Sequence, residues 1–120
     1  MRLIILSTLL LFITMGTCAQ NNNKKQEKTK VTFIELGSVK CIPCQKMQKV
    51  IKQVEETYPS QVKTVFYDVW TKDGKKYAEI YNINLIPTQV FLDEKGNEFY
   101  RHEGFFPFEE LNAIIKNQLK

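Results

Sequence analysis

The chain has 120 residues, of which 43% are hydrophobic and 25% are charged, and its formal net charge is +4. These proportions are typical of a folded globular domain and exclude a chain that is disordered or membrane-embedded throughout. The lysines are mixed with acidic residues instead of lining one stripe, so we expect no nucleic-acid partner.

Residues 1–19 have the order of a secretory signal: a basic residue, an apolar run and then small residues. The apolar run is about thirteen residues long and a bilayer-spanning helix needs about twenty, so we favour cleavage over an uncleaved anchor. Cleavage before Gln20 competes with a bacterial lipoprotein signal in which Cys18 would carry a lipid. Either route predicts an exported domain, in the periplasm or on the outer side of a bacterial membrane.

Residues 20–30 are rich in Asn, Lys, Gln and Glu and lack apolar periodicity, so we expect a flexible polar tether. A single domain is predicted over residues 31–120. Its first strand covers 31–36, a short run rich in β-branched and aromatic residues. Over 44–58 apolar residues recur at helical spacing, and Pro43 fits the first turn of that helix because the missing N–H costs nothing there.

The middle of the domain continues with a second strand and a second helix. Residues 62–69 are rich in Val, Phe and Tyr and predict a strand. Residues 74–81 predict a short helix with Tyr77, Ile80 and Tyr81 on one side. A strand, helix, strand order indicates a parallel pair of strands.

The last elements are a hairpin and a closing helix. Residues 88–92 and 98–103 flank a turn in which Gly96 can take the positive φ that the turn requires. Residues 108–119 are amphipathic, with acidic residues first and lysines last, which suits the helix dipole. The order βαβαββα, with apolar strands that need cover on both faces, predicts an α/β fold with a central mixed four-stranded sheet flanked by helices.

The cysteines carry the chemistry. If Cys18 is removed or lipidated, one pair remains, Cys41 and Cys44 in Cys-Ile-Pro-Cys. A disulfide across two residues constrains the unfolded chain very little, so a structural staple is a poor explanation. Because the pair lies where a loop enters a helix, the helix N-terminus favours a thiolate. We expect Cys41 to be the reachable, attacking thiol and Cys44 the more buried, resolving thiol.

Two charged residues are candidates for supporting roles. Lys40 precedes the first cysteine, and it either stabilises the thiolate or is a solvated loop lysine. Glu35 interrupts an apolar strand, and its side chain points either to solvent or to the interior beneath the helix start. If it is interior, we expect it to be neutral or water-bridged and able to exchange a proton with Cys44.

Four other residues have two interpretations each. For His102 we favour a surface or edge position over a catalytic base. For Trp70 we favour packing at the rim over contact with a substrate. Phe105 and Phe106 are expected to lead into the core before the final helix, with a docking patch as the alternative.

These features together resemble the thioredoxin family. The resemblance rests on Glu35 six residues before Cys41, the Cys-x-x-Cys pair, Ile86-Pro87-Thr88 at a strand entry, and Gly104 before the last helix. It covers residues 31–120 and implies a thioredoxin-like fold with a redox-active disulfide.

The resemblance also implies a substrate site. Pro87 matches the family's cis-proline beside the disulfide, and the backbone of Ile86 would pair with a substrate strand. Ile42 and Pro43, between the cysteines, would contribute contacts, and Glu35 matches the family's buried acid. The chain departs from the family pattern at three points. Lys40 replaces a tryptophan, Ile42-Pro43 replaces Gly-Pro, and the first strand and helix of full-length thioredoxin have no counterpart in the short tether.

The implied function is a thiol–disulfide oxidoreductase that reduces disulfides of exported proteins, because an isoleucine before the proline resembles reductases more than oxidases. We expect a monomer that needs no cofactor and takes electrons from a membrane electron-transfer protein. One alternative is the reverse chemistry, as an oxidase or isomerase. A second is a metal-binding module, although two cysteines and His102 fall short of the four ligands of zinc. A third is a redox-inert interaction domain.

Overall fold

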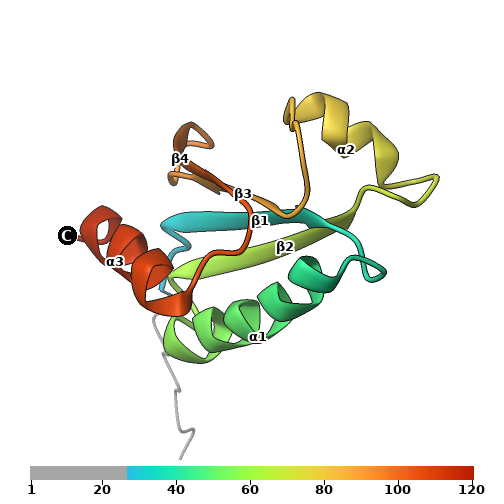
Figure 1. Cartoon of the computed structure of the whole chain (residues 1–120). Coiled ribbons are helices and arrows are strands. Elements are labelled where there is room, and N and C mark those ends of the chain that lie inside the picture. The colour runs from blue at the N-terminus through green and yellow to red at the C-terminus, as the bar shows by residue number, and fades with distance from the viewer. Residues whose placement is uncertain (1–26) are drawn as a thin grey trace, which may run out of the picture.

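The computed structural model describes residues 27–120, so the predicted signal and Cys18 lie outside the described residues. The elements follow the predicted order (Figure 1): β1 (Val31–Gly37), α1 (Ile42–Thr57), β2 (Val62–Asp68), α2 (Lys75–Ile80), β3 (Thr88–Leu92), β4 (Glu98–Glu103) and α3 (Phe108–Gln118). Within this part of the chain, no helix is long and apolar enough to cross a membrane.

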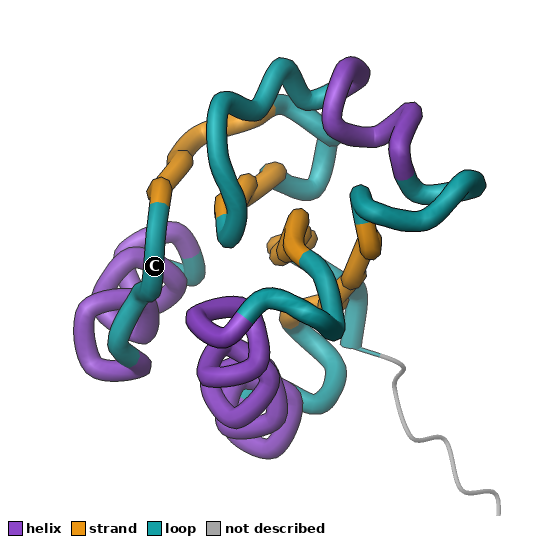
Figure 2. The backbone as a smooth tube through the Cα atoms, turned by 45° about the vertical axis from the view of Figure 1, so that its right-hand side comes forward, coloured by secondary structure: helices purple, strands orange, loops and turns teal. Residues whose placement is uncertain are grey.

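The four strands form one mixed sheet in the order β2-β1-β3-β4. Strand β1 runs parallel to β2 and antiparallel to β3, and β3 is antiparallel to β4. Helices α1 and α3 cover one face of the sheet and α2 lies on the other, which the view turned by 45° shows clearly (Figure 2). The predicted α/β fold with a flanked, mixed four-stranded sheet is confirmed.

Alternation along β1 divides the core between the two faces of the sheet. Val31 and Phe33 face α1 and α3, where the Phe33 ring stacks on Phe91 with centroids 4.9 Å apart. Ile34 and Leu36 belong to a smaller cluster on the α2 side. The strand is therefore apolar on both faces because it is covered on both, and Glu35 is its one charged residue.

Helix α2 corrects one expectation. Tyr77 stacks on Tyr67 with ring centroids 3.6 Å apart, and Tyr81 lies against the same ring. Ile80, predicted on the same side as these tyrosines, is exposed. The helix has only six residues, and the tyrosines already occupy the Tyr67 surface, so its last residue points to solvent.

Residues 27–30, which the sequence assigns to a tether, contact the domain. The Glu27 carboxylate accepts hydrogen bonds from the Ser60 hydroxyl and the Gln61 amide, both at 2.8 Å. The Lys30 N–H donates to the Gln61 carbonyl, also at 2.8 Å. Contact with the loop between α1 and β2 thus extends upstream of the predicted domain start at residue 31.

Candidate active site

The two cysteines flank the first turn of α1. Cys41 is the N-cap residue, its Cα lies 5.2 Å from that of Cys44, and the two sulfurs are at disulfide distance. The Cys41 sulfur also accepts a hydrogen bond from the backbone N–H of Cys44 at 3.4 Å. Pro43 lies in this first turn, where no intrahelical N–H is needed. The helix N-terminus therefore points its partial positive charge at Cys41.

The loop before Cys41 is shaped by Gly37 at the end of β1. A Cβ at Gly37 would lie 3.1 Å from the Cys44 sulfur and 3.2 Å from the Cys44 Cβ. A side chain at this position would push Cys44 away by a few tenths of an ångström, so glycine lets β1 and the start of α1 pack closely. The chain then turns through Ser38, whose carbonyl accepts the Cys41 N–H at 3.2 Å.

The two sulfur-bearing residues differ in exposure. Cys41 is 8% exposed and Cys44 is 1% exposed. Both are buried, but only Cys41 presents surface to an incoming disulfide. This order agrees with the predicted roles of attacking and resolving thiol. Ile42 and Pro43, between them, are both exposed.

Glu35 points into the interior. The residue is 1% exposed, and neither carboxylate oxygen has a hydrogen-bond partner among the described residues. Burial raises the pKa of Glu35 to about 8, an effect that the neighbouring Gln89 side chain opposes in part. Because side chains alternate along a strand, Glu35 shares the face of Gly37, which packs on Cys44. The sequence left this orientation open, and the structure shows a carboxyl that is mostly neutral at pH 7 beneath the helix start.

Lys40 lies on the exposed loop, and its charge acts on Asp68. Burial alone would raise the pKa of Asp68. Hydrogen bonds from the backbone N–H groups of Val39 and Trp70, together with the Lys40 charge, instead hold it below its ordinary value. Asp68 thereby ties the loop before Cys41 to the end of β2, a role that the sequence did not reveal.

The Ile86–Pro87 peptide bond is cis. Thr88 pairs with Leu36 across β1 and β3, so Pro87 lies beside Gly37, at the end of β1 from which the Cys41 loop departs. The Pro87 carbonyl accepts the Gly104 N–H at 2.7 Å, with Gly104 at positive φ. The structure thus brings together the Cys-x-x-Cys pair, Ile86-Pro87 and Gly104.

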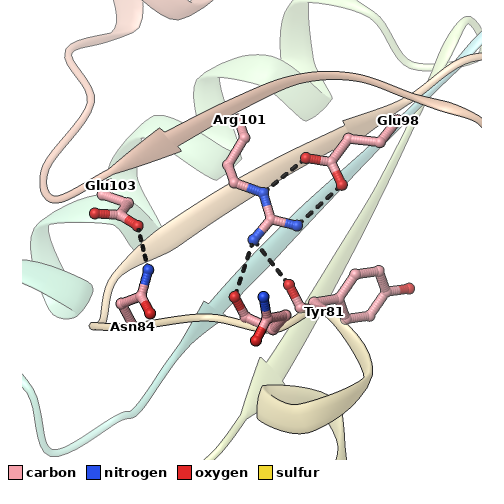
Figure 3. A network of polar contacts seen from close by, with 6 residues as sticks. Tyr81, Asn84, Glu98, Arg101 and Glu103 are labelled. Carbon is pink, nitrogen blue, oxygen red and sulfur yellow. Dashed lines mark hydrogen bonds and ion pairs between the residues drawn. The ribbon is translucent and has the colours of Figure 1, made fainter.

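The segment that leads to Ile86 is held by Arg101 on β4 (Figure 3). The guanidinium donates to the Tyr81 carbonyl at 2.8 Å and pairs with both Glu98 oxygens, at 2.7 and 2.9 Å. The Asn84 side-chain amide donates to the carboxylate of Glu103, which also lies on β4, at 3.3 Å. Strand β4 therefore anchors the chain between α2 and the cis peptide bond.

We expect Arg101→Gln to lower the free energy of unfolding by about 1 kcal/mol, because it removes a charged donor from the Tyr81 carbonyl and a half-exposed ion pair. Denaturant unfolding of the purified variant measures this loss. Lys49→Gln removes the same charge from an exposed position on α1 and is the matched control. Equal stability of Arg101→Gln and the control would contradict an anchoring role.

Exposed apolar side chains surround the disulfide. We call Val39, Ile42, Trp70 and Phe105 the apolar rim. Val39 and Ile42 lie within two residues of Cys41, and Trp70 lies two residues after Asp68, which binds the Val39 N–H. Phe105 follows Gly104, which binds the Pro87 carbonyl.

Two expectations about these aromatic residues need correction. The packing favoured for Trp70 is not found, because its side chain is 61% exposed in the turn where Asp68 accepts the Trp70 backbone N–H. The core role expected for both phenylalanines holds for Phe106 alone. Phe106 is buried against Phe91, whereas Phe105 is exposed.

Two polar residues near Glu35 complete the site. Gln89 on β3 is fully buried directly opposite Glu35, and sequence reasoning missed it. The signal was a glutamine directly before the apolar run of residues 90–92 in β3. His102 lies on the edge strand β4, as expected, but it is half-buried and hydrogen-bonded to Gln89.

Over residues 27–120, no cluster of three or more His, Cys, Asp or Glu side chains could hold a metal ion.

A mixed four-stranded sheet with a Cys-x-x-Cys pair at the start of its first helix defines a thioredoxin-like redox domain. A family model described as a thioredoxin-like domain matches residues 18–119. The chain belongs to this thioredoxin-like domain family, as the sequence resemblance indicates.

Individual relatives are distant. The chain is 28% identical over 95 residues to thioredoxin Y2, chloroplastic, of Arabidopsis thaliana, which covers 79% of this chain and 55% of the relative. It is 29% identical over 94 residues to a thioredoxin H-type of Oryza sativa subsp. indica, and the match covers 78% of this chain and 74% of the relative. The chain thus spans about half the length of the first of these relatives and about three quarters of the second.

Solved structures share the fold. A mutant thioredoxin from Halobacterium salinarum superposes with a TM-score of 0.68 at 20% identity, covering 77% of each chain. Chloroplastic thioredoxin z superposes with a TM-score of 0.66 at 22% identity, covering 79% of this chain and 81% of that one.

Proposed function

We propose that this protein is a thiol–disulfide oxidoreductase that reduces disulfides of exported proteins. The observation that carries the proposal is the Cys41 sulfur at the N-cap of α1, where it accepts the Cys44 N–H. A thiolate at this position gains the helix dipole and a backbone donor, and thiolates are the attacking species in disulfide exchange.

The proposed cycle has two steps. In the reduced protein, the Cys41 thiolate attacks one sulfur of a substrate disulfide, and the second substrate sulfur leaves as a thiolate. Cys44 then loses its proton and attacks Cys41, which forms the Cys41–Cys44 disulfide and releases the reduced substrate. The substrate gains two electrons and the protein loses two.

Glu35 takes part in the second step as the proton acceptor for Cys44. Its pKa of about 8 lies close to the ordinary thiol value of about 8.5, so proton transfer between the two groups is nearly balanced. Its position on the sheet face that packs against Cys44 supports this role. Lys40 adds positive charge to the loop without being required for the exchange.

Substrate binding is assigned to the apolar rim and to the cis-proline segment. Exposed large apolar side chains around a reactive site favour partners that present apolar chain, such as unfolded or extended segments. In this proposal the backbone of Ile86 and Pro87 pairs with such a segment, and Ile42 and Pro43 contact it. A substrate of this kind is recognised without a deep pocket.

The site of action follows from the predicted leader. An exported reductase needs a source of electrons, so we propose a membrane electron-transfer protein as the donor to Cys41–Cys44. The protein acts as a monomer and needs no cofactor for the exchange itself.

The deciding experiment is the equilibrium reduction potential of the Cys41–Cys44 pair, titrated in the purified chain against a defined thiol buffer. A value near that of thioredoxin, about −270 mV, supports the reductase. A reduction potential of about −120 mV favours the oxidase, which is the second candidate. Absence of a reversible disulfide would end the oxidoreductase proposal.

A further inference from the structure

A row of three polar side chains crosses the sheet beneath the disulfide. Glu35 on β1 is paired in register with Gln89 on β3, and Gln89 is paired with His102 on β4. Directly paired residues project from the same face of a sheet, so all three lie on the side covered by α1 and α3. The row runs from a fully buried carboxyl to a half-buried imidazole at the sheet edge.

The hydrogen bonds fix the orientation of the central carboxamide. The Gln89 Nε2 donates to the Gly104 carbonyl at 3.1 Å, so the oxygen of Gln89 faces His102. His102 Nδ1 lies 2.9 Å from that oxygen and must therefore carry the proton. With the amide turned over, the Gln89 oxygen would face the Gly104 carbonyl oxygen, and two acceptors would lie against each other.

The imidazole is itself held in place. The His102 ring stacks on Phe106 with centroids 4.0 Å apart and an interplanar angle of 13°. Phe106 is buried, and its backbone N–H contacts the Met47 sulfur on α1 at 3.3 Å. A packed ring on one side and a backbone carbonyl on the other leave Gln89 one favourable orientation.

A carboxamide nitrogen carries two N–H bonds, and Gly104 uses one of them. We propose that Gln89 is a positioning residue for Glu35, and that His102 keeps the second Gln89 N–H directed toward the Glu35 carboxyl. An N–H directed at this carboxyl stabilises its ionised form in an interior that otherwise disfavours charge. Gln89 thereby keeps Glu35 able to accept the Cys44 proton, a consequence that rests on the proposed function.

Other titratable groups around Glu35 are few. Cys41 and Cys44 stand at the start of α1, Asp68 ends β2, and β3 carries no titratable side chain. The lysines and glutamates of α1 and α3 lie on exposed faces. Two tyrosines belong to this core face. Tyr58 lies just beyond the C-terminal end of α1 and is hydrogen-bonded to Asn112, and Tyr100 lies on β4.

The test follows the Glu35 carboxyl carbon by NMR as pH is raised, in oxidised protein labelled at glutamate. Gln89→Met keeps the length of the side chain and removes its donors, so we expect the Glu35 midpoint to rise by about one pH unit. His102→Phe keeps the stack on Phe106 and removes the Nδ1 proton, so a smaller rise in the same direction is expected. Arg101→Lys, on the same strand but the opposite face, should leave the midpoint unchanged.

The outcomes separate the claims. Unchanged midpoints in both Gln89→Met and His102→Phe would overturn the proposal, and a rise in Gln89→Met alone would remove His102 from it. His102→Phe alters a half-buried position, so it stays informative if Gln89→Met does not fold. The titration needs no turnover, so a protein without reductase activity would contradict the proposed function and still allow this measurement.

A kinetic readout links the row to the redox step. A midpoint higher by one pH unit leaves about a tenth as much ionised Glu35 at pH 7. Resolution of a mixed disulfide by Cys44 should then slow by up to about tenfold at pH 7 in Gln89→Met, and the difference should vanish at high pH. A purely structural defect would slow the step equally at all pH values.

Discussion

Cys41→Ser should reduce disulfide reduction to the uncatalysed background, because no other described residue places a sulfur at the N-cap of α1. The assay is the reduction of a disulfide-bonded protein by dithiothreitol, with and without the variant. Serine is close in size to cysteine, so the fold should be retained, and circular dichroism checks this. Activity near that of the wild type would show that Cys41 is not the attacking thiol, and a wild type that does not exceed the background would favour a redox-inert interaction domain.

Cys44→Ser is the matched control, because it loses the same disulfide but keeps the attacking thiol. We expect it to form a mixed disulfide with the substrate that is not resolved and that persists until a reductant is added. Non-reducing electrophoresis and mass spectrometry detect this adduct. Adduct formation by Cys41→Ser and none by Cys44→Ser would reverse the assigned roles, against the exposures of 8% and 1%.

Glu35→Gln should stabilise the oxidised protein at alkaline pH. Burial raises the pKa of Glu35 from the ordinary 4.5 to about 8, so the folded state holds a proton that the unfolded state has lost between these values. The stability that this group contributes is full below pH 4.5 and is lost as pH rises through about 8. The rise in pKa from 4.5 to about 8 corresponds to a loss of roughly 5 kcal/mol in the stability of the wild type at high pH. Glutamine avoids this loss, but its buried, unpaired amide costs about 2 kcal/mol.

We therefore expect Glu35→Gln to have a free energy of unfolding about 3 kcal/mol above that of the wild type at pH 9, and the difference to fall with pH and reverse to a loss of about 2 kcal/mol near pH 4.5. Urea unfolding over a series of pH values measures the difference. Glu79→Gln, at an exposed position on α2, is the control and should show no such trend. A pH-independent difference at Glu35 would mean that the carboxyl is not buried in solution.

The elements themselves were predictable because their signals are local. Hydrophobic period, Pro43 in the first helical turn and Gly96 in the hairpin act over a few residues, and the predicted boundaries lie close to the observed ones. The exposure of Ile80 was missed because it depends on which partner surface the tyrosines of α2 occupy, and that surface comes from β2.

The sequence by itself determined the α/β order, the helix entry at Cys41 and Cys44, and a proline at the strand entry, since each is carried by neighbouring residues. Only the tertiary structure decided that Glu35 points inward, that Trp70 points outward, and that Gln89 and His102 align with the buried carboxyl. Glu35, Gln89 and His102 are far apart in the chain, and the register of β1, β3 and β4 brings them together. Register is set by packing on both sheet faces at once, so no local pattern could reveal which polar side chains would meet.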